Sequence, residues 1–327
     1  MKVVFYGTPA VAVPFLEDLA RGHEVVGVVT QPDKPAGRGL KLDAPAVKQT
    51  AERLGLAVFQ PETSADVAGY LQGLSADLAV AVAYGKLLKK DALELPRMGT
   101  LNVHFSLLPR CRGAAPVQWS LARGETRTGV TVFWLDEGLD TGPIAASRAL
   151  DIGPDEDAAQ LFERLVRLGR DLLAETVAEA AAGTARREPQ SGEPSFAPVI
   201  KRDDVRISFG LTASRIHNLV RGMMLGPKAF LDLRLTGRSV RLAVCRTARD
   251  APDAAACPAS AQAPGERRTS APGAIVAVER GTGFLVQCSQ GSRLWILSVQ
   301  PEGKRQMPAV DFLNGARLKV GSVLETS

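Results

Sequence analysis

The stretch "KVVFYGTPAVAVPFLEDLARGHEVVGVVT", residues 2–30, contains a strand pattern, a helix pattern and a second strand pattern. Residues 2–7 and 24–30 are short β-branched runs, and residues 13–21 carry apolar side chains at a spacing of three to four. Similar strand-like runs follow at 56–59, 77–85, 100–105 and 129–135, with helix-like stretches at 44–55, 63–74 and 116–124. This alternation predicts an α/β fold with a doubly wound, largely parallel sheet and a ligand site at the carboxyl ends of its strands.

The end of this first domain is marked by a long amphipathic helix pattern. Residues 156–182 place Leu161, Leu165, Leu168 and Leu172 on one stripe. The following segment is rich in Gly, Pro, Ser and Thr, which is typical of a linker. We therefore predict a first domain at 1–184 and a linker at 185–205.

Short strands separated by glycine fill the rest of the chain. They follow a helix pattern at 211–223 and predict a smaller C-terminal β-barrel, OB-like, over residues 206–327. Residues 248–272, rich in Ala, Pro and Ser, interrupt the strands. We interpret them as a mobile insertion.

The composition favours a soluble globular protein, since 45% of the 327 residues are hydrophobic and 23% are charged. Residues 2–7 are too short an apolar run for a signal peptide or a membrane span, so we expect a cytoplasmic location and no membrane partner. The chain has three histidines and four scattered cysteines without a CxxC pair. That pattern predicts neither a metal site nor a disulfide framework. We expect a monomer.

Positive charge is concentrated in the C-terminal third of the chain. From residue 201 onwards there are 19 Lys and Arg against 10 Asp and Glu, whereas residues 1–200 have 21 against 25. A one-sided excess of this kind suits a polyanionic partner, RNA above all, although a solvated surface would also produce it.

Polar residues interrupt one apolar strand pattern where that strand ends. In "TLNVHF" (100–105), Asn102 and His104 are two positions apart, so both project from one face of the strand. A second apolar run leads into "LDEGLDTGPI" (135–144), whose loop carries Asp136, Glu137 and Asp140. One of these carboxylates could fix the tautomer of the imidazole and relay a proton.

These residue types favour acyl transfer by direct attack of an incoming amine. The amide of Asn102 and the imidazole of His104 could stabilise an oxyanion on the acyl group. The sequence shows no obvious Ser or Cys nucleophile, and Ser106 and Cys111 are the only nearby candidates. Asn and His at a strand end are also common as structural residues.

Longer stretches resemble a known family. "NVHFSLLPRCRGAAPVQWSL" and "GVTVFWLDEGLDTGPI" are similar to the signature of the folate-dependent formyltransferases. "FYGTPAVAVPFLEDL" (5–19), "VVTQPDKPAGRGLKL" (28–42) and "VAYGKLLKKDALELP" (82–96) narrow the resemblance to those that act on methionyl-tRNA. The resemblance covers nearly the whole chain, being densest through about residue 205, and implies a formyltransferase-like fold for the first domain.

The resemblance also implies roles for individual residues. It makes Asn102, His104 and Asp140 catalytic, and it places the folate beside Ser106, Leu107, Leu108 and Pro109. The co-substrate would be 10-formyltetrahydrofolate, the acceptor would be the α-amino group of methionine on initiator tRNA, and no metal would be required. Lys34, Arg38 and Lys41 would contact tRNA, with Arg38 foremost because its planar guanidinium can stack on a base and bond phosphate.

Two alternatives remain open at this point. The same catalytic domain could formylate an amino sugar or another small amine, in which case the basic second domain would not be required. A non-enzymatic RNA-binding protein is also conceivable, but retention of all three catalytic residue types argues against it.

Overall fold

The computed structural model describes residues 1–36, 41–235, 238–249 and 270–324. The chain forms two compact units. Unit 1 comprises Met1–Pro116, Arg127–Ile152 and Phe162–Val199, and unit 2 comprises Val117–Thr126, Gly153–Leu161 and Ile200–Ser327. The predicted boundaries make each domain one continuous stretch, whereas unit 2 also takes in two short stretches from the first half of the chain.

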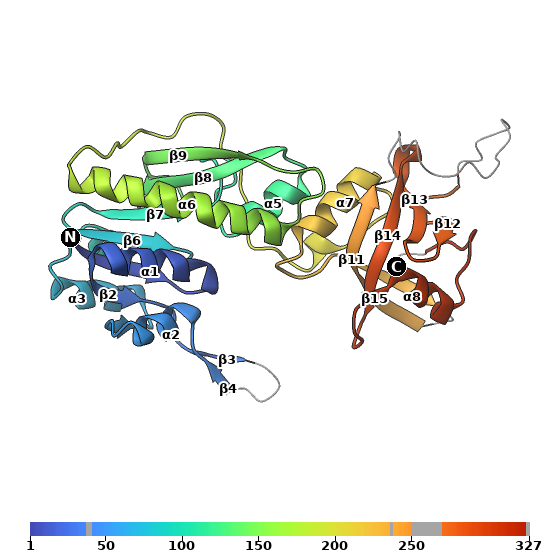
Figure 1. Ribbon diagram of the computed structural model, residues 1–327, viewed down its shortest axis with the longest axis horizontal. Helices are drawn as coiled ribbons and strands as arrows, with labels where there is room; N and C mark the ends of the chain where they lie inside the picture. Colours follow the sequence, from blue (N-terminus) through green and yellow to red (C-terminus); the bar gives the residue numbers. More distant parts are fainter. Residues whose placement is uncertain (37–40, 236–237, 250–269, 325–327) are drawn as a thin grey trace. The chain divides into compact units, whose positions relative to one another are not determined.

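Unit 1 is built on a seven-stranded sheet, which confirms the predicted α/β fold (Figure 1). Its order is β5-β2-β1-β6-β7-β8-β9, with parallel pairing from β5 to β7 and antiparallel pairing of β7 with β8 and of β8 with β9. The strands are β1 (Lys2–Gly7), β2 (Glu24–Val29), β5 (Val58–Phe59), β6 (Leu78–Val82), β7 (Thr100–His104), β8 (Arg127–Trp134) and β9 (Ile144–Asp151).

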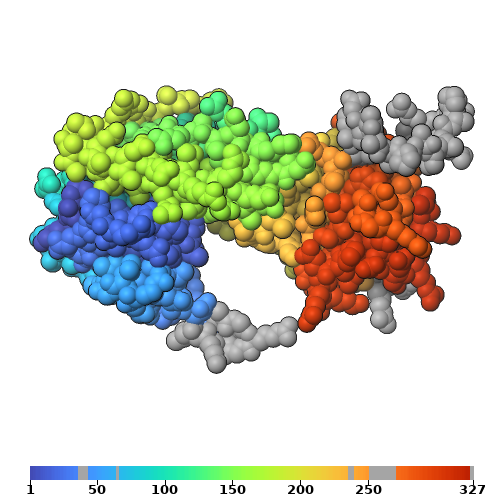
Figure 2. Space-filling view, in the orientation of Figure 1, coloured from blue at the N-terminus to red at the C-terminus, as the bar shows by residue number. Residues whose placement is uncertain are grey.

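Helices cover both faces of this sheet. The helices that begin in the first 181 residues are α1 (Val13–Gly22), α2 (Ala46–Arg53), α3 (Ser64–Gln72), α4 (Lys90–Leu93), α5 (Pro116–Ala122) and α6 (Ala158–Ala181). α6 lies against α1 and β7, because a Cβ on Gly169 would contact Phe15 and Val103. Figure 2 shows α1 and α6, in blue and yellow-green, on the near surface of unit 1. On the other face, residues of α3 and α4 pack with Val4, Tyr6, Ala79 and Ala81.

A short hairpin forms a separate two-stranded sheet (Figure 1). It consists of β3 (Lys34–Ala36) and β4 (Lys41–Asp43), paired antiparallel with Lys34 opposite Asp43. The hairpin contains Lys34 and Lys41, two of the residues predicted to contact tRNA.

Unit 2 contains an antiparallel sheet in the order β10-β11-β14-β13-β12, with β15 paired to β14. Its core includes Ile216, Phe230, Leu242, Phe284 and Ile296, all nearly inaccessible to solvent. This half-barrel agrees with the predicted OB-like domain. Its elements are α7 (Ala213–Gly222), β10 (Phe230–Leu235), β11 (Arg238–Arg249), β12 (Ile275–Glu279), β13 (Gly283–Gln287), β14 (Arg293–Pro301), β15 (Met307–Pro308) and α8 (Ala309–Ala316).

Most of the predicted insertion, residues 250–269, lies outside the described residues. The stretch predicted as a linker packs along unit 1 through backbone pairs such as Ile144 with Glu188 and Arg112 with Phe196. Among the described residues, no helix combines the length and the apolar character needed to cross a membrane.

Candidate active site

The carboxyl end of β7 carries the two polar residues that the sequence singled out. Val103 faces α6, so Asn102 and His104 project from the opposite face of the sheet. They pair in register with Phe133 and Thr131 of β8. His104 is 6% exposed, while Asn102 is half-buried.

A backbone carbonyl holds the ring of His104. Its Nε2 lies 2.9 Å from the carbonyl oxygen of Cys111. Because a carbonyl only accepts hydrogen bonds, Nε2 carries a proton and donates it. The ring therefore directs its other nitrogen, Nδ1, towards Asp140, whose Oδ2 lies 3.7 Å away.

Asp140 is fixed independently of the imidazole. The backbone N–H of Gly113 donates to its Oδ2 at 2.7 Å, and its carboxylate is 12% exposed. Its φ of 54° is left-handed, a conformation that Asp adopts more readily than most residues. A carboxylate at this distance from Nδ1 stabilises a positive charge on the ring.

The structure distinguishes between the three carboxylates of the loop. Asp136 accepts hydrogen bonds from the N–H of Gly138 and the hydroxyl of Thr141, so it holds the loop itself. Glu137 is exposed. Among the three, Asp140 is the one that the structure brings to His104.

The amide of Asn102 differs from these bonded groups. Among the described residues, no hydrogen bond ends on its side chain, and its side chain is partly accessible. It lies two residues before His104 on the same face of β7, a separation of about 6.6 Å along a strand. The amide N–H₂ is thus open to an oxygen placed near the ring.

Residues 106–109 form a closely bonded turn after β7, with a cis peptide bond between Leu108 and Pro109. The hydroxyl of Ser106 donates to the carbonyl of Arg110 at 2.6 Å, so it is already engaged. The hydroxyl of Thr131 donates to the carbonyl of Ser106 and accepts from the N–H of Leu108. Leu107 is half-buried, and Ser106, Leu108 and Pro109 are buried. Any ligand contact here depends on the backbone and on Leu107 more than on the Ser106 hydroxyl.

Two of the three predicted tRNA contacts, Lys34 and Lys41, belong to the β3–β4 hairpin. Lys34 is exposed, and its Nζ donates to Oε1 of Gln31 at 2.8 Å. Lys41 belongs to β4, whereas Arg38 lies outside the described residues. A hollow of about 210 Å³ beside Lys34 is lined also by Thr8 and Pro9, which follow β1.

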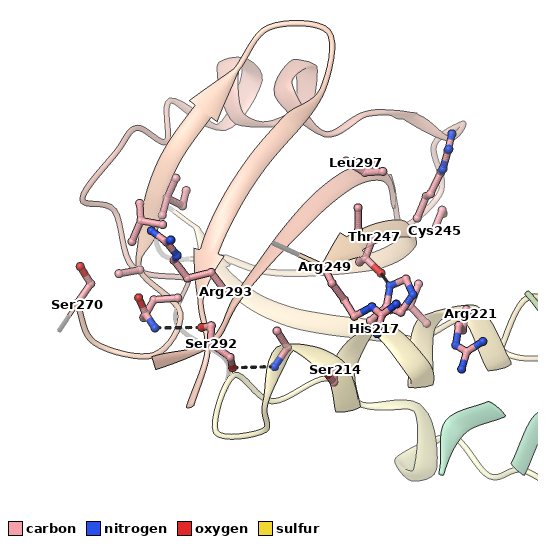
Figure 3. Close-up of a pocket in the computed structure, with 18 of the residues that line it drawn as sticks. Ser214, His217, Arg221, Cys245, Thr247, Arg249, Ser270, Ser292, Arg293 and Leu297 are labelled. Atoms are coloured by element: carbon pink, nitrogen blue, oxygen red, sulfur yellow. Dashed lines mark hydrogen bonds between the residues drawn. The ribbon is translucent and has the colours of Figure 1, made fainter. Parts of the chain in front are cut away.

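Unit 2 has a larger hollow of about 2090 Å³ between α7, β11 and neighbouring strands (Figure 3). Its wall includes four arginines: Arg221, Arg246, Arg249 and Arg293. Arg221 donates to the carbonyls of Gly153 and Glu156, so it joins α7 to that stretch. Arg246, Arg249 and Arg293 are exposed. The wall also includes Asp155 and Asp157, and Asp155 pairs with Arg249, so arginines outnumber aspartates in the hollow.

Sequence reasoning missed three contributors to the site. The carbonyl of Cys111 bonds His104, the hydroxyl of Ser195 accepts from the N–H of Cys111 at 2.9 Å, and Gln190 bonds the Asp140 loop. A backbone carbonyl has no sequence signal, and Gln190 and Ser195 lie in a stretch whose composition indicates a linker. Within the described part of the chain, no group of three or more His, Cys, Asp or Glu side chains could hold a metal ion.

The sequence of this chain is similar to those of known formyl transferases. Residues 1–177 match the family model for formyl transferase, and residues 199–317 match the model for the formyl transferase C-terminal domain. The methionyl-tRNA formyltransferase of Elusimicrobium minutum is 40% identical over 99% of this chain and 99% of its own length. That of Solibacter usitatus is 43% identical over 97% of this chain and 96% of its own.

Solved structures resemble the fold at lower identity. The N-formyltransferase of Helicobacter canadensis, in complex with folinic acid and dTDP-3-aminofucose, is 17% identical with a TM-score of 0.62, over 90% of this chain and 98% of that one. HypX of Aquifex aeolicus, in complex with tetrahydrofolic acid, is 16% identical with a TM-score of 0.63, over 98% of this chain and 48% of that one. The chain matches both family models and is 40% and 43% identical to the Elusimicrobium minutum and Solibacter usitatus relatives over nearly its full length. It therefore belongs to the methionyl-tRNA formyltransferases of the formyl transferase family.

Proposed function

We propose that this enzyme transfers the formyl group of 10-formyltetrahydrofolate to the α-amino group of methionine on initiator tRNA. Residues 1–184 carry the chemistry, residues 185–205 connect the domains, and residues 206–327 contribute to tRNA binding. The observation that carries the proposal is the cluster at the end of β7. An open amide, a bonded imidazole and a fixed carboxylate lie together there, with the nearby Ser106 hydroxyl already engaged.

The reaction requires a group that stabilises negative charge on the formyl oxygen. The neutral α-amino nitrogen attacks the formyl carbon, and a C–N bond forms while the carbonyl electrons move to the oxygen. The amide of Asn102 donates to that oxygen. Nδ1 of His104, when protonated, is the second donor, because Nε2 is already bonded to Cys111.

Asp140 accepts the proton that the attacking nitrogen must lose. Its carboxylate offsets the charge of a protonated His104 and accepts the amine proton. As the intermediate collapses, the bond between the formyl carbon and the folate nitrogen breaks, and that nitrogen takes the proton. Atoms and charge then balance without a covalent enzyme intermediate.

The folate co-substrate binds along residues 106–109, at the turn that follows the catalytic strand. Buried Leu108 and Pro109 make this turn a fixed wall. The half-buried side chain of Leu107 is the apolar contact that a pterin ring can use. Ser106 contributes by holding the turn.

Transfer RNA binds through basic side chains of two regions. Lys34, Arg38 and Lys41 belong to the segment around the β3–β4 hairpin, and Arg246 and Arg293 belong to the hollow of unit 2. Arginine and lysine on phosphates release counterions, so binding through them weakens as salt concentration rises. An Arg38→Ala variant should lose tRNA affinity and keep folate affinity, measured at one defined salt concentration.

The direct test is a formylation assay. The protein is incubated with 10-formyltetrahydrofolate and methionyl initiator tRNA, and formyl-methionine released from the tRNA is quantified. Formation of formyl-methionine is expected. Absence of product, with donor and tRNA both active towards a control formyltransferase, would contradict the proposal.

An amino-sugar acceptor is the alternative that this assay can also examine. The Helicobacter canadensis protein was crystallised with a dTDP-amino sugar, so dTDP-3-aminofucose is a suitable competing acceptor. Faster formylation of the sugar than of the tRNA would favour the alternative.

A further inference from the structure

We propose that Gln190 and Ser195 are positioning residues that hold Asp140 and His104 in their working geometry. This inference rests on the proposed catalytic roles of those two side chains. Both positioning residues belong to residues 188–197, which follow α6 and pack along unit 1. We call this stretch the bracing segment.

The bracing segment is attached at both ends to loops of the site. At one end, Glu188 and Ile144 exchange two backbone hydrogen bonds, of 2.9 and 2.7 Å. At the other, the N–H of Arg112 donates to the carbonyl of Ser195 at 2.8 Å, and the N–H of Ala197 donates to the carbonyl of Arg112 at 2.7 Å. The segment therefore connects the loop that carries Asp140 with the loop that follows His104.

Gln190 uses every polar position of its amide. Its Nε2 donates to the carbonyls of Asp140 and Gly142, both at 2.8 Å. Its Oε1 accepts from Nη2 of Arg112 at 2.6 Å and from Nε at 3.2 Å. Because the carbonyl of Asp140 is fixed on this side and its carboxylate is bonded by Gly113, the direction of the side chain is determined from both ends.

Ser195 acts on the imidazole through the backbone around Cys111. Its hydroxyl accepts from the N–H of Cys111, and its carbonyl accepts from the N–H of Arg112. The N–H of Arg112 and the carbonyl of Cys111 belong to one peptide group and point in opposite directions. Binding the N–H to Ser195 therefore turns the carbonyl towards Nε2 of His104, where the 2.9 Å bond is found.

This geometry predicts an effect on turnover rather than on substrate binding. A misplacement of about 1 Å can lower a catalytic rate about 10²-fold. Gln190 touches the backbone of the Asp140 loop and not the reacting atoms, so its removal should loosen the carboxylate without removing it. For Gln190→Ala we expect kcat to fall about tenfold, with KM for both substrates nearly unchanged.

A double-mutant cycle distinguishes a positioning role of Gln190 from a merely structural one. If Gln190 acts through Asp140, Gln190→Ala should lower kcat about tenfold in the wild-type enzyme and less than twofold in an Asp140→Asn background. The pH profile of kcat should also shift in the single variant, since the pair that moves the proton is displaced. Equal losses in both backgrounds, or an unchanged kcat and pH profile in the folded single variant, would overturn the proposal.

Matched variants keep the test interpretable. Gln160→Ala removes another glutamine that bonds a backbone group, the N–H of Asp157, and should leave kcat unchanged. Gln190→Glu keeps the acceptor for Arg112 and loses the donors to the Asp140 loop, so it serves if the alanine variant does not fold, and it should also lower kcat. Ser195→Ala removes the acceptor of the Cys111 N–H but keeps the Ser195 carbonyl that bonds Arg112, so it should lower kcat less than Gln190→Ala does.

The failure of the proposed function looks different from the failure of this inference. If Asp140 were not catalytic, the Asp140→Asn enzyme alone would retain wild-type kcat. If Gln190 were not a positioning residue, Asp140→Asn would still be impaired and the losses would simply multiply.

Discussion

Two buried histidines, one in each unit, have an aspartate beside them, yet their surroundings differ. His104 is 6% exposed, and His217 in α7 is 3% exposed. Asp140 beside His104 is 12% exposed and bonded by a backbone N–H, whereas Asp155 beside His217 is 69% exposed. Nδ1 of His217 lies 3.0 Å from the hydroxyl of Thr247. Figure 3 draws this contact as a line between the two side chains.

A buried His–Asp pair is therefore not by itself a catalytic unit. The pKa of His217 is lowered to about 4, chiefly by burial and to a smaller extent by the nearby Arg221 and Arg249, while Asp155 opposes this shift. The ring is therefore neutral at physiological pH, and its partners are a hydroxyl and an aspartate in contact with water. At His104 the backbone bonds both partners of the pair and leaves Nδ1 facing a carboxylate.

The largest expected difference in kcat is between a variant that lacks the His104 ring and one that lacks the His217 ring. His104→Ala should lower kcat about 10²-fold or more, in the range of a lost acid–base or oxyanion group, with little change in RNA affinity. His217→Gln should keep kcat within about twofold. Single-turnover formylation at saturating tRNA measures both, and equal kcat losses in folded proteins would remove the distinction between the two histidines.

Replacing the aspartates should give the next largest contrast. Asp140→Asn retains size and removes the charge next to His104, so kcat should fall by roughly 10². Asp155→Asn should leave kcat unchanged while shifting the pKa of His217 further down, because the charge of Asp155 raises that pKa. NMR titration of the His217 ring follows the shift, and a rise in its pKa would contradict this account.

Acid stability tests the neutral state of His217. Its folded pKa of about 4 lies below the ordinary value of 6.5, so the unfolded chain takes up a proton first as pH falls. This contribution to stability is complete above pH 6.5 and declines towards pH 4, by at most about 3 kcal/mol. Denaturant unfolding between pH 7 and pH 4 measures it.

The matched control for acid stability is His217→Gln, which has no ring to titrate. Other groups also lose stability in acid; the Arg170 guanidinium, for example, lowers the pKa of Asp18. The difference between wild type and variant isolates His217. Parallel curves for the two proteins would show that folding does not lower the pKa of the His217 ring.

The smallest expected effect concerns the hydroxyl beside His217. Thr247→Val keeps the shape of the side chain and removes one neutral hydrogen bond, which should cost about 1 kcal/mol of unfolding free energy. Turnover should be unaffected. A drop in kcat at unchanged stability would assign this histidine a functional role after all.

The fold was largely predictable because most of its strands and helices have a local pattern of apolar residues in the sequence. The six strand patterns of the first domain correspond to β1, β2, β5, β6, β7 and β8, and the helix predicted at 156–182 is α6 (Ala158–Ala181). The prediction missed β9 (Ile144–Asp151), an edge strand rich in Ala with most residues partly exposed. Its position depends on pairing with β8, a contact that no local pattern carries. The β3–β4 hairpin was missed because it contains Pro35 and has only three residues in each strand.

The candidate site was predictable to the extent that its members project from regular structure. Asn102 and His104 follow from the two-residue period of a strand. The choice of Asp140 among three loop carboxylates came from a resemblance, and the distance to His104 is consistent with it. Gln190 and Ser195 lie about ninety residues from His104 in sequence, and their contacts depend on how an irregular stretch packs. Tertiary packing alone brings them there.

The bracing segment is synthesised after all three proposed catalytic residues. A nascent chain that has emerged to residue 187 already holds Asn102, His104 and Asp140, yet it lacks the residues that bond the two loops from outside. At a translation rate of roughly 5–20 residues per second, the segment appears within seconds of α6. The catalytic geometry should therefore be completed only after residues 188–197 have emerged, and transfer to tRNA should begin later, after unit 2 has followed.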